Sequence, residues 1–254
     1  MDLHFKKTGH GAPLILLHGL LGSLDNLAAF AEVAAAHFTV YSVDQRNHGL
    51  SPHAEEMNYE SMADDLARFA DSHALAQTFV LGHSMGGKTA MQFALSFPAR
   101  VAKLVVVDIA PRAYSPRHTE IFEALLALDL NFIRSRTEAE NELAKKIPNP
   151  IVRRFLLKNL AGSEAGGLRW KSNVPGISKN YPQLYDAIPG GPSFANPALF
   201  VAGGKSHHLL ESDLPQIREI FPLAEFQTLP NASHWVHADA PAEFAKIVLE
   251  FLRR

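Results

Sequence analysis

The chain has 254 residues, of which 47% are hydrophobic and 20% are charged, a composition that supports a folded core and excludes a largely disordered protein. Its formal net charge of -2 gives no overall bias toward nucleic acid or a membrane surface, so no partner of either kind is expected. Cysteine is absent, which excludes disulfides, thiolate catalysis and cysteine-ligated metals.

The beginning of the chain and its apolar runs bear on targeting. The first residues lack the long apolar segment of a signal peptide. No apolar run approaches the ~20 residues that a membrane helix needs, and the run at residues 14–17 ends at His18 and Gly19. These features predict a soluble protein, cytoplasmic by default.

Short apolar runs alternate with amphipathic segments along most of the chain. An antiparallel strand is predicted around residues 3–7. Most of the other runs are almost continuously apolar, as strands buried on both faces of a sheet are. These runs cover residues 14–17, 39–43, 78–81, 103–107, 199–202 and 225–229. Helical spacing of apolar residues appears at 62–69 and 244–251. This alternation predicts an α/β fold with a mostly parallel central sheet flanked by helices.

The alternation stops between residues 111 and 197. This segment is predicted to contain helices only, over residues 116–128, over a stretch opened by the capping-box pattern at residues 137–140, and over residues 151–160. We expect it to be an insertion that lies over one end of the sheet. The predicted organisation is therefore a core of residues 1–110 and 198–254 with a helical cap of residues 111–197.

The predicted cap differs from the core in charge. Residues 111–195 contain 12 Lys and Arg against 8 Asp and Glu, whereas the rest of the chain contains 12 against 18. A basic cap attracts anionic substrates, although such side chains more often solvate helix surfaces. Aromatic residues of the cap are candidates to line a pocket, although each is more often part of a core; they are Phe122, Phe132, Phe155, Trp170 and Tyr181.

A G-x-S-x-G pattern occupies residues 82–86, directly after the apolar run at 78–81 and before a helix-like stretch at 87–97. In this pattern a strand turns sharply into a helix, and the glycines let the backbones pass closely. The serine hydroxyl is then exposed at a helix N-terminus, where the helix dipole favours negative charge. The pattern and its context predict that Ser84 is a catalytic nucleophile.

A serine nucleophile needs a base, and His234 is the predicted one. It lies in a loop after the last predicted strand and before the last predicted helix, which fits the chain order Ser, acid, His. His237 is the chief alternative. His207 and His208 are adjacent and lack metal-ligand spacing, so we expect a surface loop there, with no metal site and no cofactor.

The acid of the triad is less obvious, because the strand-like run at 199–204 is not followed directly by a carboxylate. The preceding strand ends at Asp108, which places this carboxylate at the carboxyl edge of the sheet, where ligands bind in open α/β folds. Asp108 is therefore the predicted acid, and Asp213 is the alternative. Ser206 occupies the vacated position and is predicted to hydrogen-bond Asp108 or His234.

Transition-state stabilisation requires donors that point at the oxyanion. The backbone N–H of Met85, immediately after the nucleophile, is one predicted donor. The other is the backbone N–H of Leu20, in the glycine-containing loop at residues 18–22, where His18 is expected to be structural. Lys88 lies in the first turn of the nucleophile helix, against the helix dipole. A salt bridge is expected for it, with a substrate contact as the alternative.

Several motifs in fixed order resemble those of the α/β-hydrolase superfamily, most closely its small bacterial esterases of the YbfF type. The segments that carry the resemblance are residues 17–19, 44–51, 82–88, 107–111, 169–175 and 234–237. The resemblance implies an α/β-hydrolase fold with the cap inserted after strand six. It also implies hydrolysis of carboxylic esters, with acyl-CoA thioesters as a further substrate class.

The leading hypothesis is thus a serine esterase that forms an acyl-enzyme on Ser84 and acts on a small-molecule ester or thioester. A carbon–carbon bond hydrolase of the same fold keeps the same three residues, and dione substrates would identify it. A noncatalytic ligand receptor on a hydrolase scaffold would react with a serine-directed phosphonate without turning over. The oligomeric state and the natural substrate stay open.

Overall fold

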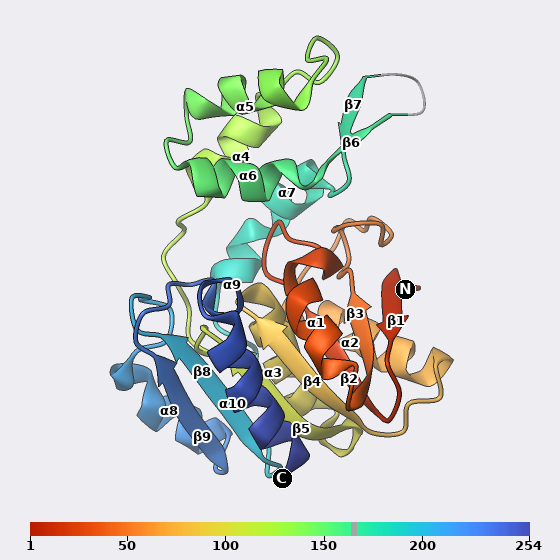
Figure 1. The fold of residues 1–254 in the computed structure, drawn as a ribbon, viewed down its shortest axis with the longest axis vertical. Helices are drawn as coiled ribbons and strands as arrows, with labels where there is room; N and C mark the ends of the chain where they lie inside the picture. The colour runs from red at the N-terminus through yellow and green to blue at the C-terminus, as the bar shows by residue number, and fades with distance from the viewer. Residues whose placement is uncertain (164–166) are drawn as a thin grey trace.

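The computed structural model describes residues 1–163 and 167–254. Within them, seven strands form one sheet in the order β1-β3-β2-β4-β5-β8-β9 (Figure 1). The edge strand β1 pairs antiparallel with β3, and the other pairs are parallel. The strands are β1 (Phe5–Thr8), β2 (Ala12–Leu17), β3 (Phe38–Val43), β4 (Thr78–His83), β5 (Val101–Val107), β8 (Ala198–Gly203) and β9 (Ala224–Leu229). The predicted α/β fold with a mostly parallel sheet is confirmed.

Helices cover both faces of this sheet. One face carries α1 (Ala28–Ala34) and α10 (Pro241–Arg253), and the other carries α2 (Tyr59–Ser72), α3 (Met85–Ser96) and α8 (Leu214–Ile220) (Figure 1). Short helical turns complete the core: η1 (Leu24–Leu27), η2 (Pro98–Arg100), η3 (Glu211–Asp213) and α9 (Val236–Asp239). Among the described residues, no helix is both long and apolar enough to cross a membrane.

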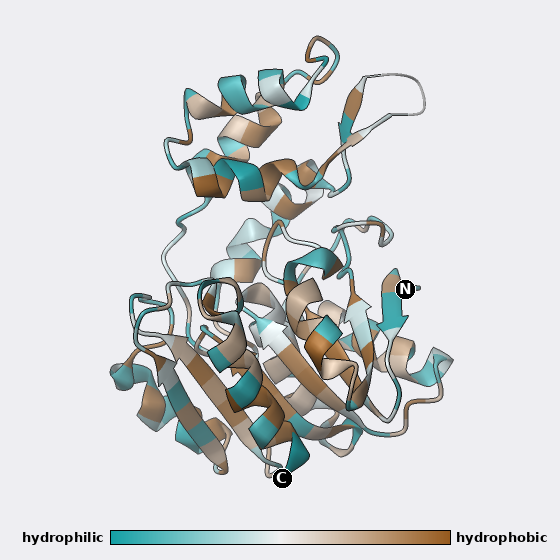
Figure 2. Cartoon of the chain, viewed as in Figure 1, coloured by the Kyte–Doolittle hydropathy of each residue, from teal (hydrophilic) through white to brown (hydrophobic). Residues whose placement is uncertain are grey.

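The central strands separate two hydrophobic cores, which explains why their sequences are largely apolar. In β2, Ile15 and Leu17 pack into the core under α2 and α3, while Leu14 and Leu16 pack into the core under α1 and α10. Successive side chains of a strand point to opposite faces, so the last four residues of β2, 14–17, are all buried. Figure 2 shows the resulting apolar strands between helices of mixed character.

The segment between β5 and β8 folds over the carboxyl ends of the strands (Figure 1). It contains α4 (Thr119–Leu126), α5 (Arg136–Ala144), α6 (Pro150–Leu157) and α7 (Val174–Tyr185). It follows the fifth strand of this chain rather than the sixth. The prediction of helices only was wrong, because β6 (Leu160–Gly162) and β7 (Leu168–Trp170) form an antiparallel hairpin.

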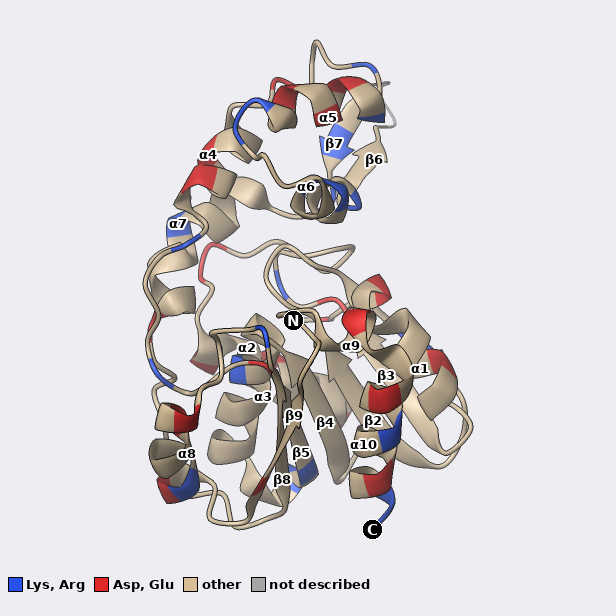
Figure 3. Cartoon of the chain, turned by 60° about the vertical axis from the view of Figure 1, so that its left-hand side comes forward, with Lys and Arg blue, Asp and Glu red and all other residues tan. Residues whose placement is uncertain are grey.

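Local side-chain chemistry also differs from the prediction in this insertion. Helix α5 begins after Ser135, whose side chain accepts a hydrogen bond from the Glu138 N–H, so Ser135 rather than Thr137 is the N-cap. Charge is unevenly distributed: basic residues lie on α6 and β7, whereas acidic residues lie on α5 (Figure 3). The basic character is therefore concentrated on particular elements of the insertion.

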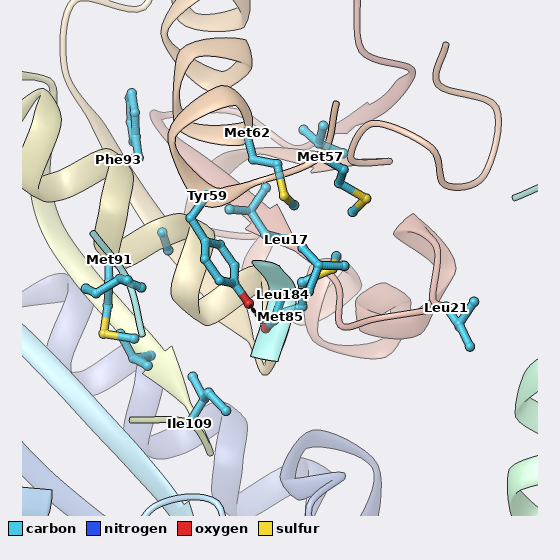
Figure 4. Close-up of a cluster of buried hydrophobic side chains, with 14 of the residues drawn as sticks. Leu17, Leu21, Met57, Tyr59, Met62, Met85, Met91, Phe93, Ile109 and Leu184 are labelled. Carbon is cyan, nitrogen blue, oxygen red and sulfur yellow. Dashed lines mark hydrogen bonds between the residues drawn. The ribbon is translucent and has the colours of Figure 1, made fainter. Parts of the chain in front are cut away.

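Buried polar contacts hold the insertion on the core. The Asn173 N–H donates to the Asn47 carbonyl at 2.8 Å, and the Asn180 amide donates to the Glu55 carbonyl at 2.8 Å. The hydroxyl of Tyr59, on α2, donates at 2.6 Å to the carbonyl of residue 184, on α7 (Figure 4). Since buried hydrogen bonds of this kind are costly to break, they fix the insertion above the end of β4.

Candidate active site

The site begins at the sharp turn between β4 and α3. Ser84 has φ 54° and ψ −119°, a left-handed conformation that strains a residue with a side chain. The turn requires glycine at position 82, because a Cβ atom there would clash with the Gly86 carbonyl oxygen at 2.1 Å. The glycines of the motif thus permit the turn that presents the Ser84 hydroxyl at the N-terminus of α3.

Three predicted residues from distant parts of the chain meet at this turn. His234 Nε2 lies 3.0 Å from Ser84 Oγ, and His234 Nδ1 lies 2.7 Å from Asp108 Oδ2. One ring nitrogen therefore faces the hydroxyl while the other faces the carboxylate. This is the arrangement that lets an imidazole remove the serine proton while a carboxylate fixes its tautomer and orientation.

Asp108 follows β5 and is fully buried, in a left-handed conformation with φ 52°. Its Oδ1 accepts the Gly203 N–H at 2.9 Å, and its Oδ2 accepts a short hydrogen bond from the Ser206 hydroxyl in addition to its contact with His234. These donors stabilise the ionised carboxylate. The alternative acid, Asp213, instead accepts a hydrogen bond from Arg112 Nε at 2.6 Å.

Other histidines surround His234, and each has a lowered pKa. Burial, followed by the electrostatic effect of His234, lowers the pKa of His118, His208 and His237 to about 4 in each case. Burial and the effects of His237 and His234 also hold the pKa of His83 well below its usual value. These rings are therefore neutral at neutral pH. Within the described part of the chain, His237 Nδ1 has no hydrogen-bond partner, so this alternative base lacks an orienting carboxylate.

The residues of the two predicted oxyanion donors, Leu20 and Met85, line the same cavity as Ser84. Met85 is the first residue of α3, so its N–H has no acceptor within the helix. Leu20 lies in the loop after β2. The next residue, Leu21, has φ 56°; its N–H donates to His48 Nε2 at 3.0 Å, and its carbonyl accepts from the Asn159 amide. Core and insertion together hold this loop in place.

A cavity extends from Ser84 between the core and the insertion. Phe155 and Tyr181 line it, as predicted for aromatic residues of the cap. Phe122 is instead buried against Tyr181, and Phe132 is 78% exposed. Trp170 borders a different groove, next to α4 and α7. Two of the five candidates therefore face the space above Ser84.

Comparisons with known proteins agree with this geometry. Residues 12–241 match the model of the alpha/beta hydrolase fold family. The chain belongs to the α/β-hydrolase family. It is 36% identical to the esterase YbfF of Escherichia coli, over 96% of this chain and 94% of that protein. It is also 36% identical to the sn-1-specific diacylglycerol lipase ABHD11 of Danio rerio, over 98% of this chain and 81% of that protein.

A solved structure described as a marine microorganism esterase superposes with a TM-score of 0.96. It is 44% identical, with coverage of 98% of this chain and 99% of that one. These relatives place the chain in the esterase and lipase group of the α/β-hydrolase family.

Two residues of this α/β-hydrolase have surroundings that the sequence did not reveal. The expectation of a surface loop is wrong for His208: its ring stacks on that of His234 with centroids 3.8 Å apart, and its Nδ1 lies 3.2 Å from Ser206 Oγ. The expectation of a salt bridge is wrong for Lys88. Its ammonium group donates to the backbone carbonyls of Arg112 and Asp186 instead.

Asp108, His208 and His234 each offer a ligand atom, and these atoms lie within 4.8 Å of one another, so they form a possible metal site. The carboxylate and His234 already contact each other at 2.7 Å. A metal held there would occupy the ring nitrogen that faces Asp108. It would therefore compete with the arrangement that orients His234 toward Ser84.

Proposed function

We propose that this α/β-hydrolase is a serine esterase in which Ser84 is the nucleophile, His234 the general base and Asp108 the orienting acid. The observation that carries the proposal is the continuous series of contacts from Asp108 Oδ2 to His234 Nδ1 and from His234 Nε2 to Ser84 Oγ. Its two steps are those of acyl transfer through a covalent intermediate.

In the first step, Ser84 Oγ attacks the ester carbonyl carbon while His234 Nε2 takes the hydroxyl proton. The carbonyl oxygen becomes an oxyanion, which the N–H groups of Leu20 and Met85 are placed to bind. His234 then gives its proton to the alcohol oxygen, the carbon–oxygen bond breaks, and the alcohol leaves. The acyl group remains on Ser84.

In the second step, His234 removes a proton from water, and the hydroxide oxygen attacks the acyl carbon. Collapse of the second tetrahedral intermediate returns the proton to Ser84 and releases the carboxylic acid. The neutral rings of His83, His208 and His237 favour this cycle, because they surround the imidazolium without adding positive charge beside it.

The cavity supports an acyl ester as substrate, because aromatic side chains such as Phe155 and Tyr181 line it next to Ser84. The names of the esterase and lipase relatives agree with this substrate class. Acyl-CoA thioesters are the finer proposal, motivated by the basic residues of the insertion. Rising salt should then weaken the binding of an acyl-CoA more than that of a neutral ester. An equal salt response would remove this extension while leaving the esterase intact.

A series of p-nitrophenyl esters of increasing acyl length tests the proposal. The wild-type protein should hydrolyse them, and Ser84→Ala should lose turnover while keeping its circular dichroism spectrum. The chain-length profile would then report on the cavity. Wild-type protein that hydrolyses no ester in the series would contradict the proposal, and turnover of a dione substrate would redirect it to carbon–carbon bond hydrolysis.

A further inference from the structure

Lys88 has an unusual position for a lysine. It lies on α3, four residues after Ser84, and is only 1% exposed. The Lys88 N–H donates to the carbonyl of Ser84, the residue that caps the helix, at 3.1 Å. Both residues line the same cavity. The two residues are thus separated by the first turn of α3.

Among the described residues, the hydrogen-bond acceptors of this ammonium group are backbone carbonyls rather than a carboxylate. Its Nζ donates to the carbonyl of Arg112, at 2.8 Å, and to that of Asp186. It also lies 4.8 Å from the ring centroid of Tyr114 and 5.5 Å from that of Tyr59, the tyrosine drawn in Figure 4. Within the described ranges no carboxylate is in ion-pair contact with it, and the Asp186 carboxylate acts on it only through space. A lysine ammonium has three donors, and the two carbonyls use two of them.

The charge of the cavity also favours an anionic ligand. Among the described residues that line it, Lys88 and Arg117 are cationic and none is Asp or Glu. Burial lowers the pKa of Lys88 to about 7, an effect that Asp186 opposes and Arg112 reinforces. A buried ammonium group that has no carboxylate in direct contact is unfavourable, so an anion bound at this place would be stabilising.

We propose that Lys88 binds a carboxylate on the acyl group of the substrate, so that the enzyme prefers half-esters of short dicarboxylic acids to uncharged esters of equal length. The inference rests on the proposed function, because it assumes that Ser84 attacks the ester carbonyl. Because Lys88 follows Ser84 by only one turn of α3, we expect a short acyl chain to link the ester carbonyl to this carboxylate. Lys88 is then a specificity-determining residue, in addition to holding the two backbone segments that enter and leave the insertion.

Matched pairs of methyl esters test this proposal, with hydrolysis followed by proton release at constant pH. The charged substrates are the monomethyl esters of succinic, glutaric and adipic acids, and their neutral counterparts are methyl butanoate, pentanoate and hexanoate. For at least one length, wild-type kcat/KM should be at least tenfold higher for the charged member. Lys88→Met, which keeps a long apolar side chain, should lower this charged-to-neutral ratio by roughly 10- to 100-fold, the range of a charge-assisted hydrogen bond.

Arg117→Met is the matched control, because Arg117 borders the same cavity but is exposed and therefore screened by solvent. It should change the ratio by less than about threefold. A ratio lowered as much by Arg117→Met as by Lys88→Met would overturn the assignment to Lys88. So would an equal loss on both members of a pair in Lys88→Met, which would show that Lys88 only holds the insertion.

The charged-to-neutral ratio of kcat/KM in the wild-type protein tests the proposal without any variant, so the test holds even if Lys88→Met does not fold. A ratio of one or less at all three lengths would overturn the proposal while the esterase function stands. Absence of hydrolysis of every ester would instead mean that the proposed function itself fails.

Discussion

Replacing Asp108 by asparagine tests how this site keeps His234 in the tautomer that can accept a proton from Ser84. The carboxylate has two different tasks, since Oδ1 accepts the Gly203 N–H and Oδ2 accepts from His234 Nδ1 and Ser206. An asparagine has only one oxygen for these positions. If that oxygen stays on Gly203, the new NH₂ group points at His234 Nδ1.

An NH₂ group facing Nδ1 favours the tautomer whose proton is on Nε2, and that nitrogen then cannot deprotonate Ser84. The opposite amide orientation places two N–H donors against each other at Gly203, which is also unfavourable. We therefore expect Asp108→Asn to lower kcat by about 10³- to 10⁴-fold, equivalent to about 4–5.5 kcal/mol of transition-state stabilisation.

The assay is the initial rate with p-nitrophenyl butyrate at pH 7.5, for variants whose circular dichroism and thermal unfolding show a native fold. Asp213→Asn is the control, because Asp213 pairs with Arg112 and should keep kcat within about tenfold of wild type. An Asp108→Asn variant that keeps more than a tenth of the wild-type kcat would refute the tautomer argument. A large loss in Asp213→Asn alone would move the acid to that residue.

Two further predictions concern the scaffold. Gly82→Ala should destabilise the protein by about 3 kcal/mol in urea unfolding, because the new Cβ would lie 2.1 Å from the Gly86 oxygen. The control Gly162→Ala, whose new Cβ meets nothing within 4 Å, should change stability by less than about 0.5 kcal/mol. Equal effects of the two substitutions would contradict the close-packing argument. Burial raises the pKa of Asp65 but hydrogen bonds led by Arg46 lower it overall, so its stabilising effect is present above its unfolded pKa of about 4 and is lost as pH falls through the lower folded value. Asp65→Asn should cost about 3–5 kcal/mol at pH 7, because it leaves the buried Arg46 without its partner, and this cost should shrink toward pH 3; a cost independent of pH would exclude the ion pair as its source.

The main features of the core could be predicted because they depend on local patterns. The last four residues of β2 and of β5 are buried on both faces of the sheet, so these stretches are continuously apolar. The turn at residues 82–86 needs glycine for steric reasons, so its pattern is visible in the sequence. Asp108 could be chosen because it follows a buried strand, which places it at the same sheet edge as Ser84.

Other features depend on contacts between distant residues. Each strand of the β6–β7 hairpin has three residues, too few for a recognisable alternation. The stacking of His208 on His234 joins two loops that only the folded sheet brings together. The partners of Lys88 are backbone carbonyls, which any residue type supplies, so no sequence pattern identifies them.

Labelling with a fluorophosphonate most directly tests the central claim that Asp108 and His234 activate Ser84. The reagent phosphonylates an activated serine hydroxyl, and peptide mass spectrometry locates the adduct. We predict one adduct on Ser84 in the wild-type protein, none in Ser84→Ala, and labelling slowed at least about 100-fold in His234→Ala. An adduct on another residue, or equally fast labelling without His234, would contradict the account.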